Sequence, residues 1–173
     1  STPSYDHVET AVAKVNCPVL LNGNVTSFES ANKLRKLTGS HGVMIGRSAI
    51  RNPWIFRQIR ESQRGEAVFR PTLSDVYEYV EDLYDSIEKP EIEERKNVGR
   101  MKKFLNFVGL SVDTEGQFLH LMRRTQNKKD LFEVCADYLL RSGRESQFYS
   151  LEPFEGLVAR PSSESSYSPC QLG

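Results

Sequence analysis

Two short polar segments of this sequence have the composition of an anion-binding site. Each comes directly after a short apolar run, and their sequences are Asn22-Gly23-Asn24 and Gly46-Arg47-Ser48. Glycine lets the backbone approach a ligand closely and exposes peptide N–H groups, which donate hydrogen bonds to anions. The guanidinium of Arg47 can add two charge-assisted hydrogen bonds to one phosphate. The segments therefore predict a phosphate site, and plain strand-to-helix turns are the alternative that the spacing leaves open.

A second group of residues has the spacing of a polyanion-binding surface. Lys96, Arg100 and Lys103 follow at intervals of four and three residues, so on a helix they share one side. Further positive charge comes shortly afterwards, at Arg123 and Arg124. Such a surface can contact the phosphates of RNA, whereas solvated helix faces with ion pairs between them are the simpler alternative. The acidic residues available for such pairs lie on an earlier segment: Asp75, Glu78, Glu81, Asp82, Asp85 and Glu88.

The other reactive side chains predict no catalytic residue and no metal site. They are Cys17, Cys135, Cys170, His7, His41 and His120. The cysteines are odd in number and far apart, so they form neither a metal-ligand pattern nor a disulfide framework. The histidines share no spacing that is typical of metal ligands. We therefore expect a reducing, cytoplasmic setting.

The bulk composition is that of a globular protein without a marked charge. The chain has 173 residues, 38% of them hydrophobic and 27% charged, and its Lys+Arg and Asp+Glu counts are both 23. Bulk charge therefore gives no indication of a nucleic-acid partner, and only a local basic face can. No apolar run approaches the roughly 20 residues of a membrane helix. The chain does not begin with Met, so we expect it to start inside a longer protein.

The first third of the chain must position the two polar segments. The apolar runs 17–22 and 42–46 predict buried strands. Between them, Thr26 and Glu29 have capping-box spacing and predict a helix that stops near Gly39. A further helix is expected to start between residues 48 and 53, with a proline in its first turn. This alternation predicts an α/β arrangement with two parallel strands.

The rest of the chain predicts helices only. Residues 65–71 contain Gly65 and Pro71 and resemble a linker. Helical periodicity then predicts a small all-α bundle in residues 72–142, with four helices over 72–89, about 91–109, 115–124 and 128–142. Thr72 and Asp75 have the spacing of a cap at the start of the first of them. Ser, Pro, Glu and Gln dominate after residue 142, so residues 143–173 are expected to be a disordered tail.

Three blocks of the sequence together resemble the last two barrel strands of the tRNA-dihydrouridine synthases. They are Asn22-Gly23-Asn24-Val25, Gly42-Val43-Met44-Ile45-Gly46-Arg47 and Asn52-Pro53-Trp54-Ile55-Phe56. Two later blocks resemble basic clusters of the family's helical domain: Arg100-Met101-Lys102-Lys103-Phe104-Leu105 and Arg123-Arg124. The resemblance covers about residues 5 to 142, and the combination of blocks is specific.

This resemblance implies the C-terminal part of a (β/α)8 TIM barrel in residues 1–64, followed by a tRNA-binding helical domain in residues 72–142. Full-length members of the family are flavoproteins that bind FMN, use NADPH to reduce it, and convert uridine in tRNA to dihydrouridine. By resemblance, the FMN contacts are Asn22, Gly23, Asn24, Gly46 and Arg47. The tRNA contacts are Lys96, Arg100, Lys103, Arg123 and Arg124.

The sequence departs from the family pattern at two of these positions. Asn24 stands where the family often has Asp, and Ser48 stands where it often has Gly. More is missing upstream, because a complete barrel needs about 200 residues. The family's catalytic cysteine also lies upstream, and none of the three cysteines matches it. We therefore expect this chain to be inactive alone and the full-length enzyme to be monomeric. A standalone helical RNA-binding module with a vestigial barrel remnant is the alternative.

Overall fold

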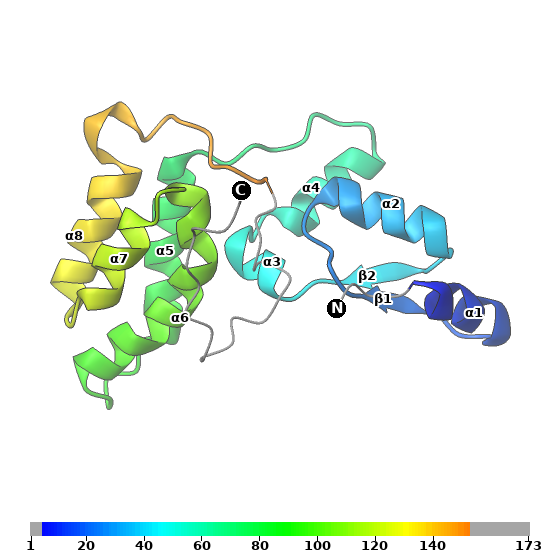
Figure 1. Cartoon of the computed structure of the whole chain (residues 1–173), viewed down its shortest axis with the longest axis horizontal. Coiled ribbons are helices and arrows are strands. Elements are labelled where there is room, and N and C mark those ends of the chain that lie inside the picture. Colours follow the sequence, from blue (N-terminus) through cyan, green and yellow to red (C-terminus); the bar gives the residue numbers. More distant parts are fainter. Residues whose placement is uncertain (1–4, 153–173) are drawn as a thin grey trace, which may run out of the picture.

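The computed structural model describes residues 5–152, which are mostly helical with one small sheet (Figure 1). The elements, in chain order, are α1 (Asp6–Lys14), β1 (Leu20–Asn22), α2 (Phe28–Thr38), β2 (Gly42–Met44), α3 (Arg47–Arg51), α4 (Ile55–Gln63), α5 (Leu73–Ile87), α6 (Glu94–Val112), α7 (Gln117–Arg124), α8 (Lys128–Leu139) and the 3-10 helix η1 (Arg141–Gly143). Helices α5 to α8 gather at one end of the molecule, the sheet with α1 and α2 at the other, and α3 lies between them.

The two strands pair in parallel, as the strand–helix–strand order predicts. Leu20 faces Gly42, and the last pair of the ladder is Asn22 with Met44. Both strands are shorter than the apolar runs that predicted them. Pro18 has no N–H to donate to a ladder, and Gly46 has φ −104° and ψ −103°, which is not extended backbone. One face of the sheet is open to solvent, because Leu20 is 63% and Met44 is 58% exposed.

Helix α2 starts one residue later than the capping-box spacing predicts. Its N-cap is Ser27, whose Oγ accepts a hydrogen bond of 3.2 Å from Ser30 N, while Ser30 Oγ accepts one of 3.0 Å from Ser27 N. The predicted cap by Thr26 and Glu29 is therefore wrong, since two serines at the same spacing supply both hydrogen bonds. The predicted end is confirmed: Gly39 is the C-cap, with φ +67°.

The single helix predicted after β2 is instead two helices. α3 ends at Arg51 and α4 begins at Ile55. Pro53 causes the break, because the residue before a proline is disfavoured in helical conformation, and Asn52 accordingly has φ −132° and ψ 85°. Trp54 packs its ring against those of Phe69 and Tyr79.

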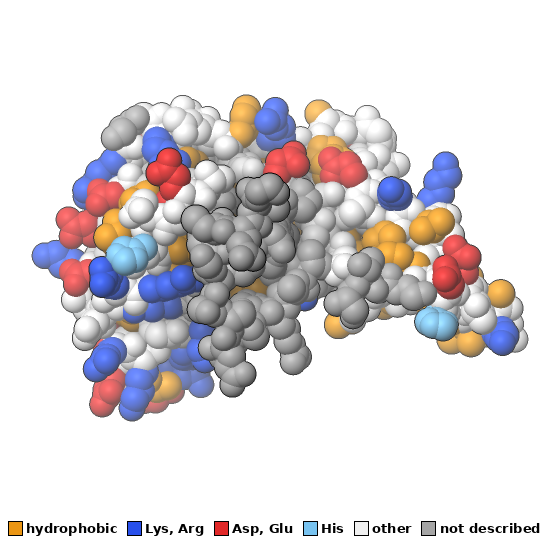
Figure 2. Space-filling view, in the orientation of Figure 1, with side chains coloured by type: hydrophobic (Ala, Val, Ile, Leu, Met, Phe, Trp, Pro, Cys, Tyr) orange, Lys and Arg blue, Asp and Glu red, His pale blue; other side chains and the backbone are white. Residues whose placement is uncertain are grey.

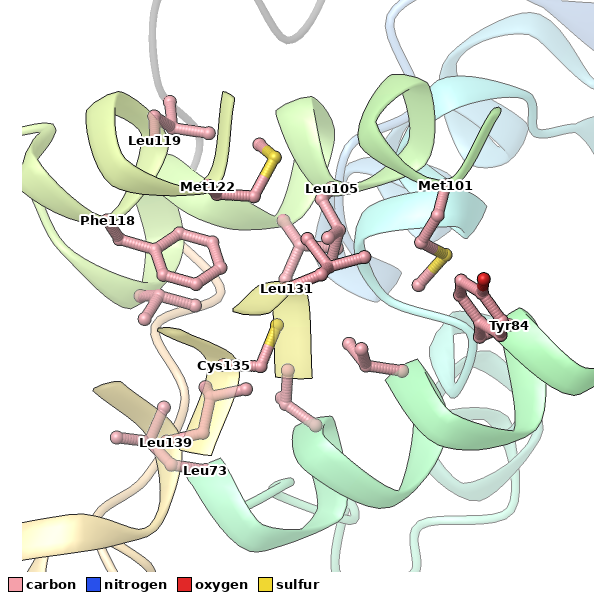
Figure 3. Packing of buried hydrophobic residues seen from close by; sticks show 14 of the residues in the cluster. Leu73, Tyr84, Met101, Leu105, Phe118, Leu119, Met122, Leu131, Cys135 and Leu139 are labelled. Carbon is pink, nitrogen blue, oxygen red and sulfur yellow. The ribbon is translucent and has the colours of Figure 1, made fainter. Parts of the chain in front are cut away.

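Helices α5 to α8 pack around one hydrophobic core (Figure 3). The side chains that meet there come from all four helices and include Leu73, Tyr84, Met101, Leu105, Phe118, Leu119, Met122, Leu131, Cys135 and Leu139. Thr72 caps α5 as predicted: its Oγ1 accepts from Asp75 N at 3.2 Å, and its N–H donates to the Asp75 carboxylate at 2.6 Å. A separate, smaller core lies under the sheet and includes Leu21, Ala31 and Ile55.

The structure differs from the predicted disordered tail for residues 143–152. Phe148 forms an antiparallel bridge with Thr72, and Tyr149 is 3% exposed, within the core of the helical end. Its N–H donates to Pro71 O at 2.8 Å. Composition missed this contact because one buried aromatic side chain, that of Tyr149, anchors an otherwise polar segment. The remainder of the predicted tail, residues 153–173, lies outside the described residues. Within residues 5–152, no helix combines the length and apolar character that a membrane crossing requires.

Two glycines of α6 provide a matched test of helix packing. A Cβ at Gly109 would overlap the Leu119 side chain of α7, with its Cγ only 2.6 Å away, whereas a Cβ at Gly99 would meet no atom within 4 Å. We expect Gly109→Ala to lower the free energy of unfolding by about 1–3 kcal/mol, because α7 must move away. Gly99→Ala should raise it by up to about 1 kcal/mol, because alanine favours helix. Chemical denaturation of both variants checks this, and equal stabilities would contradict the close contact.

Candidate functional site

The two polar segments leave the sheet at the same edge. In the parallel ladder Asn22 lies opposite Met44, so the chain turns away from both strands at their carboxyl ends. Carboxyl ends of parallel strands are where ligands bind in open α/β sheets. The sequence prediction that these segments form one site therefore has the required topology.

Backbone conformation at the first segment is unusual. Gly23 has φ +130° and Asn24 has φ +49°, and Asn24 is the one non-glycine residue with positive φ among residues 5–152. Asparagine tolerates this conformation better than most residues. The hydroxyl of Tyr5 donates a 3.2 Å hydrogen bond to Gly23 O and so secures the turn. The segment thus has a defined backbone turn beside the sheet, which is held by Tyr5.

The second segment opens α3. Gly46 is its N-cap, and a Cβ at Gly46 would meet no atom within 4 Å, so there is open space beside this turn. Arg47 is the first helical residue and is half-buried, while the next residue, Ser48, is buried. Because α3 has five residues, its dipole is small. The positive character of the site therefore comes from the Arg47 guanidinium and from peptide N–H groups.

The other end of α3 is held by a buried arginine. Arg51 has no exposed surface, and its guanidinium donates to Glu152 O at 2.8 Å, Leu151 O at 2.9 Å and Thr26 O at 3.2 Å. Burial lowers the pKa of Arg51, while Tyr149 and Glu152 act in the opposite direction. The three carbonyls replace the water that this charge has lost. They belong to the turn before α2 and to the segment after η1, so Arg51 joins two distant parts of the chain.

Two tyrosines from the helical end also contact α3. Tyr79 of α5 donates a 2.9 Å hydrogen bond to Ile50 O. The Tyr149 hydroxyl lies 3.3 Å from Arg51 O and 3.2 Å from Val108 O of α6. Burial raises the pKa of Tyr79 to about 12 and raises that of Tyr149 as well, so both hydroxyls keep their proton at neutral pH. They satisfy carbonyls at the end of α3 that lack partners within the helix.

The predicted basic residues of α6 lie on one continuous helix, as their spacing required. Lys96 and Lys103 are exposed, and Arg100 is partly buried with one guanidinium nitrogen, Nη1, lacking a hydrogen-bond partner in residues 5–152. Lys96 pairs with Glu93 of its own helix at 3.4 Å. Within the same residues, none of the three forms an ion pair with the acidic face of α5, whereas Lys128 of α8 pairs with Asp85 at 3.4 Å and with Glu88 at 3.3 Å. Lys and Arg side chains gather over α6 and α7 in Figure 2.

The two arginines of α7, Arg123 and Arg124, contact different neighbours. Arg123 of α7 donates a 2.9 Å hydrogen bond to Asn106 of α6, so it joins the α6 surface next to Lys103. Arg124 instead contacts His120, with Nη1 2.8 Å from Nε2 along α7. The structure therefore brings Arg123 beside the α6 residues and directs Arg124 along its own helix.

Several residues that shape the site gave no signal in the sequence. Arg51, Tyr79 and Tyr149 act on backbone carbonyls that are distant in sequence, and no spacing rule identifies such partners. Lys102 is similar: its Nζ donates to Arg123 O at 3.0 Å and to Thr125 O, so it caps α7 rather than facing solvent with Lys103. Helical periodicity shows which residues of α6 share a face, but it does not show which neighbouring element covers that face.

The cysteines and acidic residues form no reactive group in the described part of the chain. Cys135 is buried in the helical core, where desolvation raises its pKa to about 12, and Cys17 is exposed. Cys170 lies outside the described residues. No three His, Cys, Asp or Glu side chains of residues 5–152 come together as metal ligands.

Comparisons with known proteins give a consistent match. The sequence profile of the dihydrouridine synthase (Dus) family matches residues 1–141. The chain is 41% identical over 73 residues to tRNA-dihydrouridine synthase B of Pseudomonas putida, which covers 42% of this chain and 22% of that protein. It is 27% identical over 124 residues to tRNA-dihydrouridine(16) synthase of Neisseria meningitidis serogroup B, covering 72% of this chain and 37% of that protein. The chain thus spans well under half the length of these relatives.

The Arg51 contacts lead to a stability prediction. Arg51→Lys should lower the free energy of unfolding by about 2–4 kcal/mol, because one ammonium cannot reach three carbonyls and leaves buried acceptors unpaired. Arg60→Lys is the matched control, since Arg60 is exposed on α4 and should change stability by less than about 0.5 kcal/mol. Urea denaturation compares the two, and equal effects would show that Arg51 is not the link described.

Proposed function

Since the chain belongs to the dihydrouridine synthase family, we propose that it is the C-terminal portion of an FMN-dependent tRNA-dihydrouridine synthase. In this proposal residues 1–64 are the last part of a TIM barrel, residues 65–71 a linker and residues 72–142 the tRNA-binding helical domain. NADPH would be the reductant, in a monomeric cytoplasmic enzyme. The catalytic cysteine would be contributed by chain upstream of Ser1.

The observation that carries the proposal is the parallel register of β1 and β2. It puts Asn22 opposite Met44 and so places the two polar turns at one sheet edge, in the position expected of a phosphate site in a barrel. The same edge leads directly into α3, which packs against α6. An anion site and a basic helix therefore belong to one continuous body.

The residues at this edge fit the phosphate end of FMN. Arg47 offers a guanidinium, the open space beside Gly46 admits a ligand atom, and Asn24 offers an amide for a phosphate or ribityl oxygen. The replacement of the family's usual Asp by Asn24 keeps a hydrogen-bonding group and removes a charge that would repel phosphate. When bound, FMN would supply the electrons that reduce the uracil ring. The role of this chain would be to hold its phosphate.

The basic surface of α6 and α7 would hold the tRNA backbone. Arg100 and Lys103 make no ion pair with other described residues, so their charges are available to phosphates. Arg123 extends this surface from α7 through its contact with Asn106. Such contacts are independent of sequence and position the nucleic acid rather than identify a base. The direct test is NADPH-dependent dihydrouridine formation in unmodified tRNA by the full-length protein.

Removal of the Arg47 charge should weaken flavin binding. We expect full-length Arg47→Ala to purify with at least about fivefold less FMN than the unaltered protein, because charge-assisted hydrogen bonds to phosphate contribute roughly 1.5–3 kcal/mol. Flavin absorbance per protein measures this directly. Arg60→Ala removes an exposed arginine from α4 and should leave the flavin content unchanged. Equal flavin in Arg47→Ala would contradict the phosphate assignment, and tRNA binding without any flavin would favour the standalone RNA-binding module.

Neutralising the α6 surface should weaken tRNA binding and its dependence on salt. For Lys96→Ala/Arg100→Ala/Lys103→Ala we expect the slope of log affinity against log salt to fall in magnitude by up to about 2.7, because each of the three lost phosphate contacts removes the release of roughly 0.9 counterions. A control that removes three exposed cations from α1 and α2 should keep the slope: Lys14→Ala/Lys33→Ala/Lys36→Ala. Filter binding over a salt series measures both, and matching slopes would refute a specific role for α6.

A further inference from the structure

One short helix connects the two candidate binding regions. α3 carries Arg47 at its first position and Arg51 at its last, a distance of roughly 6 Å along the helix axis at 1.5 Å per residue. Its body packs against α6, the helix that carries Arg100 and Lys103. A rotation of α3 against α6 would therefore change the orientation of the basic surface relative to the candidate anion site.

Two hydroxyl groups fix this contact. The Tyr149 Oη lies between α3 and α6, 3.3 Å from Arg51 O and 3.2 Å from Val108 O. Tyr79 Oη adds a 2.9 Å hydrogen bond from α5 to Ile50 O, one residue earlier in α3. Tyr149 is 3% exposed, so water does not replace these bonds at low cost. Backbone carbonyls are rigid acceptors, which makes such bonds sensitive to the relative position of the helices.

The Tyr149 contact lies beyond the residues that the family profile matches. That match ends at residue 141, whereas the segment that returns to α3 comprises residues 144–152. Within it, Tyr149 contacts α3 and α6, and Leu151 O and Glu152 O accept from Arg51. The segment therefore adds a second connection between the sheet end and the helical end, in addition to the linker.

We propose that Tyr149 and Tyr79 are positioning residues that lock α3 against α6 and so set the direction in which the basic surface presents tRNA to the flavin. This inference rests on the proposed function. Without the two hydroxyls, the helical end samples further orientations, of which only a fraction aligns tRNA with the flavin site. The apparent affinity for tRNA then falls to that fraction of its value, while the rate of the aligned complex does not change.

The test uses the full-length enzyme with Tyr149→Phe, Tyr79→Phe and the double variant. We expect KM for tRNA to rise about three- to tenfold in the double variant, with kcat within about twofold and flavin content unchanged, as expected for loss of roughly one or two hydrogen bonds. Tyr138→Phe is the control, because the Tyr138 ring packs on Phe118 in the same core and its hydroxyl makes no hydrogen bond within residues 5–152. It should match the unaltered enzyme.

Each outcome is decisive. An unchanged KM in the double variant, in an enzyme that forms dihydrouridine, would overturn the positioning role and leave the proposed function intact. A parallel loss of kcat, flavin content and thermal stability would also overturn it, because that pattern indicates a merely structural role. An unaltered enzyme that forms no dihydrouridine and binds no flavin would refute the proposed function itself, and the positioning role with it.

Discussion

The rest of the structure depends on how the buried charge of Arg51 is solvated. A guanidinium without exposed surface is stable only when polar groups replace water, and here three backbone carbonyls do so. Those carbonyls lie before α2 and after η1, so the charge is satisfied only when both segments close over α3. Arg51 thereby holds both segments at the centre of the molecule, and α3 in turn contacts the helical end through its packing on α6 and the hydroxyls of Tyr79 and Tyr149.

Local chemistry in the sequence was sufficient to predict most of the elements. The Thr72 cap, the Gly39 stop, the parallel strand pair and the spacing of Lys96, Arg100 and Lys103 all depend on residues that are close in sequence. Errors occurred where two local signals competed. Ser27 replaced Thr26 as a cap because a second serine stood at the matching position, and Pro53 divided one expected helix into two. In each case the type of structure was right and the boundary was wrong.

The residues of the candidate site also fall into two groups, those that local sequence patterns indicate and those that they do not. The positions of its candidate anion-binding and basic residues could be predicted, because glycine turns and charge periodicity are local patterns; that these residues bind FMN or tRNA stays a prediction. The contacts of Arg51, Tyr79 and Tyr149 could not be predicted. Each of these residues contacts a backbone carbonyl oxygen, and every residue type has the same carbonyl, so the sequence does not indicate the partner. A polar composition after residue 142 also concealed Tyr149, the buried aromatic residue that anchors that segment. The sequence therefore indicated the candidate binding groups, whose role stays a prediction, and gave no sign of the residues that contact the backbone of α3.

The return of the chain to α3 makes the described fold a closed loop. Residues before α2 and residues after η1 meet at the same guanidinium, although more than a hundred positions separate them along the chain. The linker is consequently one of several attachments between the ends of the molecule, which include this returning segment, the packing of α3 on α6 and the hydrogen bond from Tyr79 to Ile50 O. If the linker were cleaved, the contacts of Arg51 and Tyr149 would still hold the two pieces together. The relative position of the two ends therefore does not depend on the linker alone.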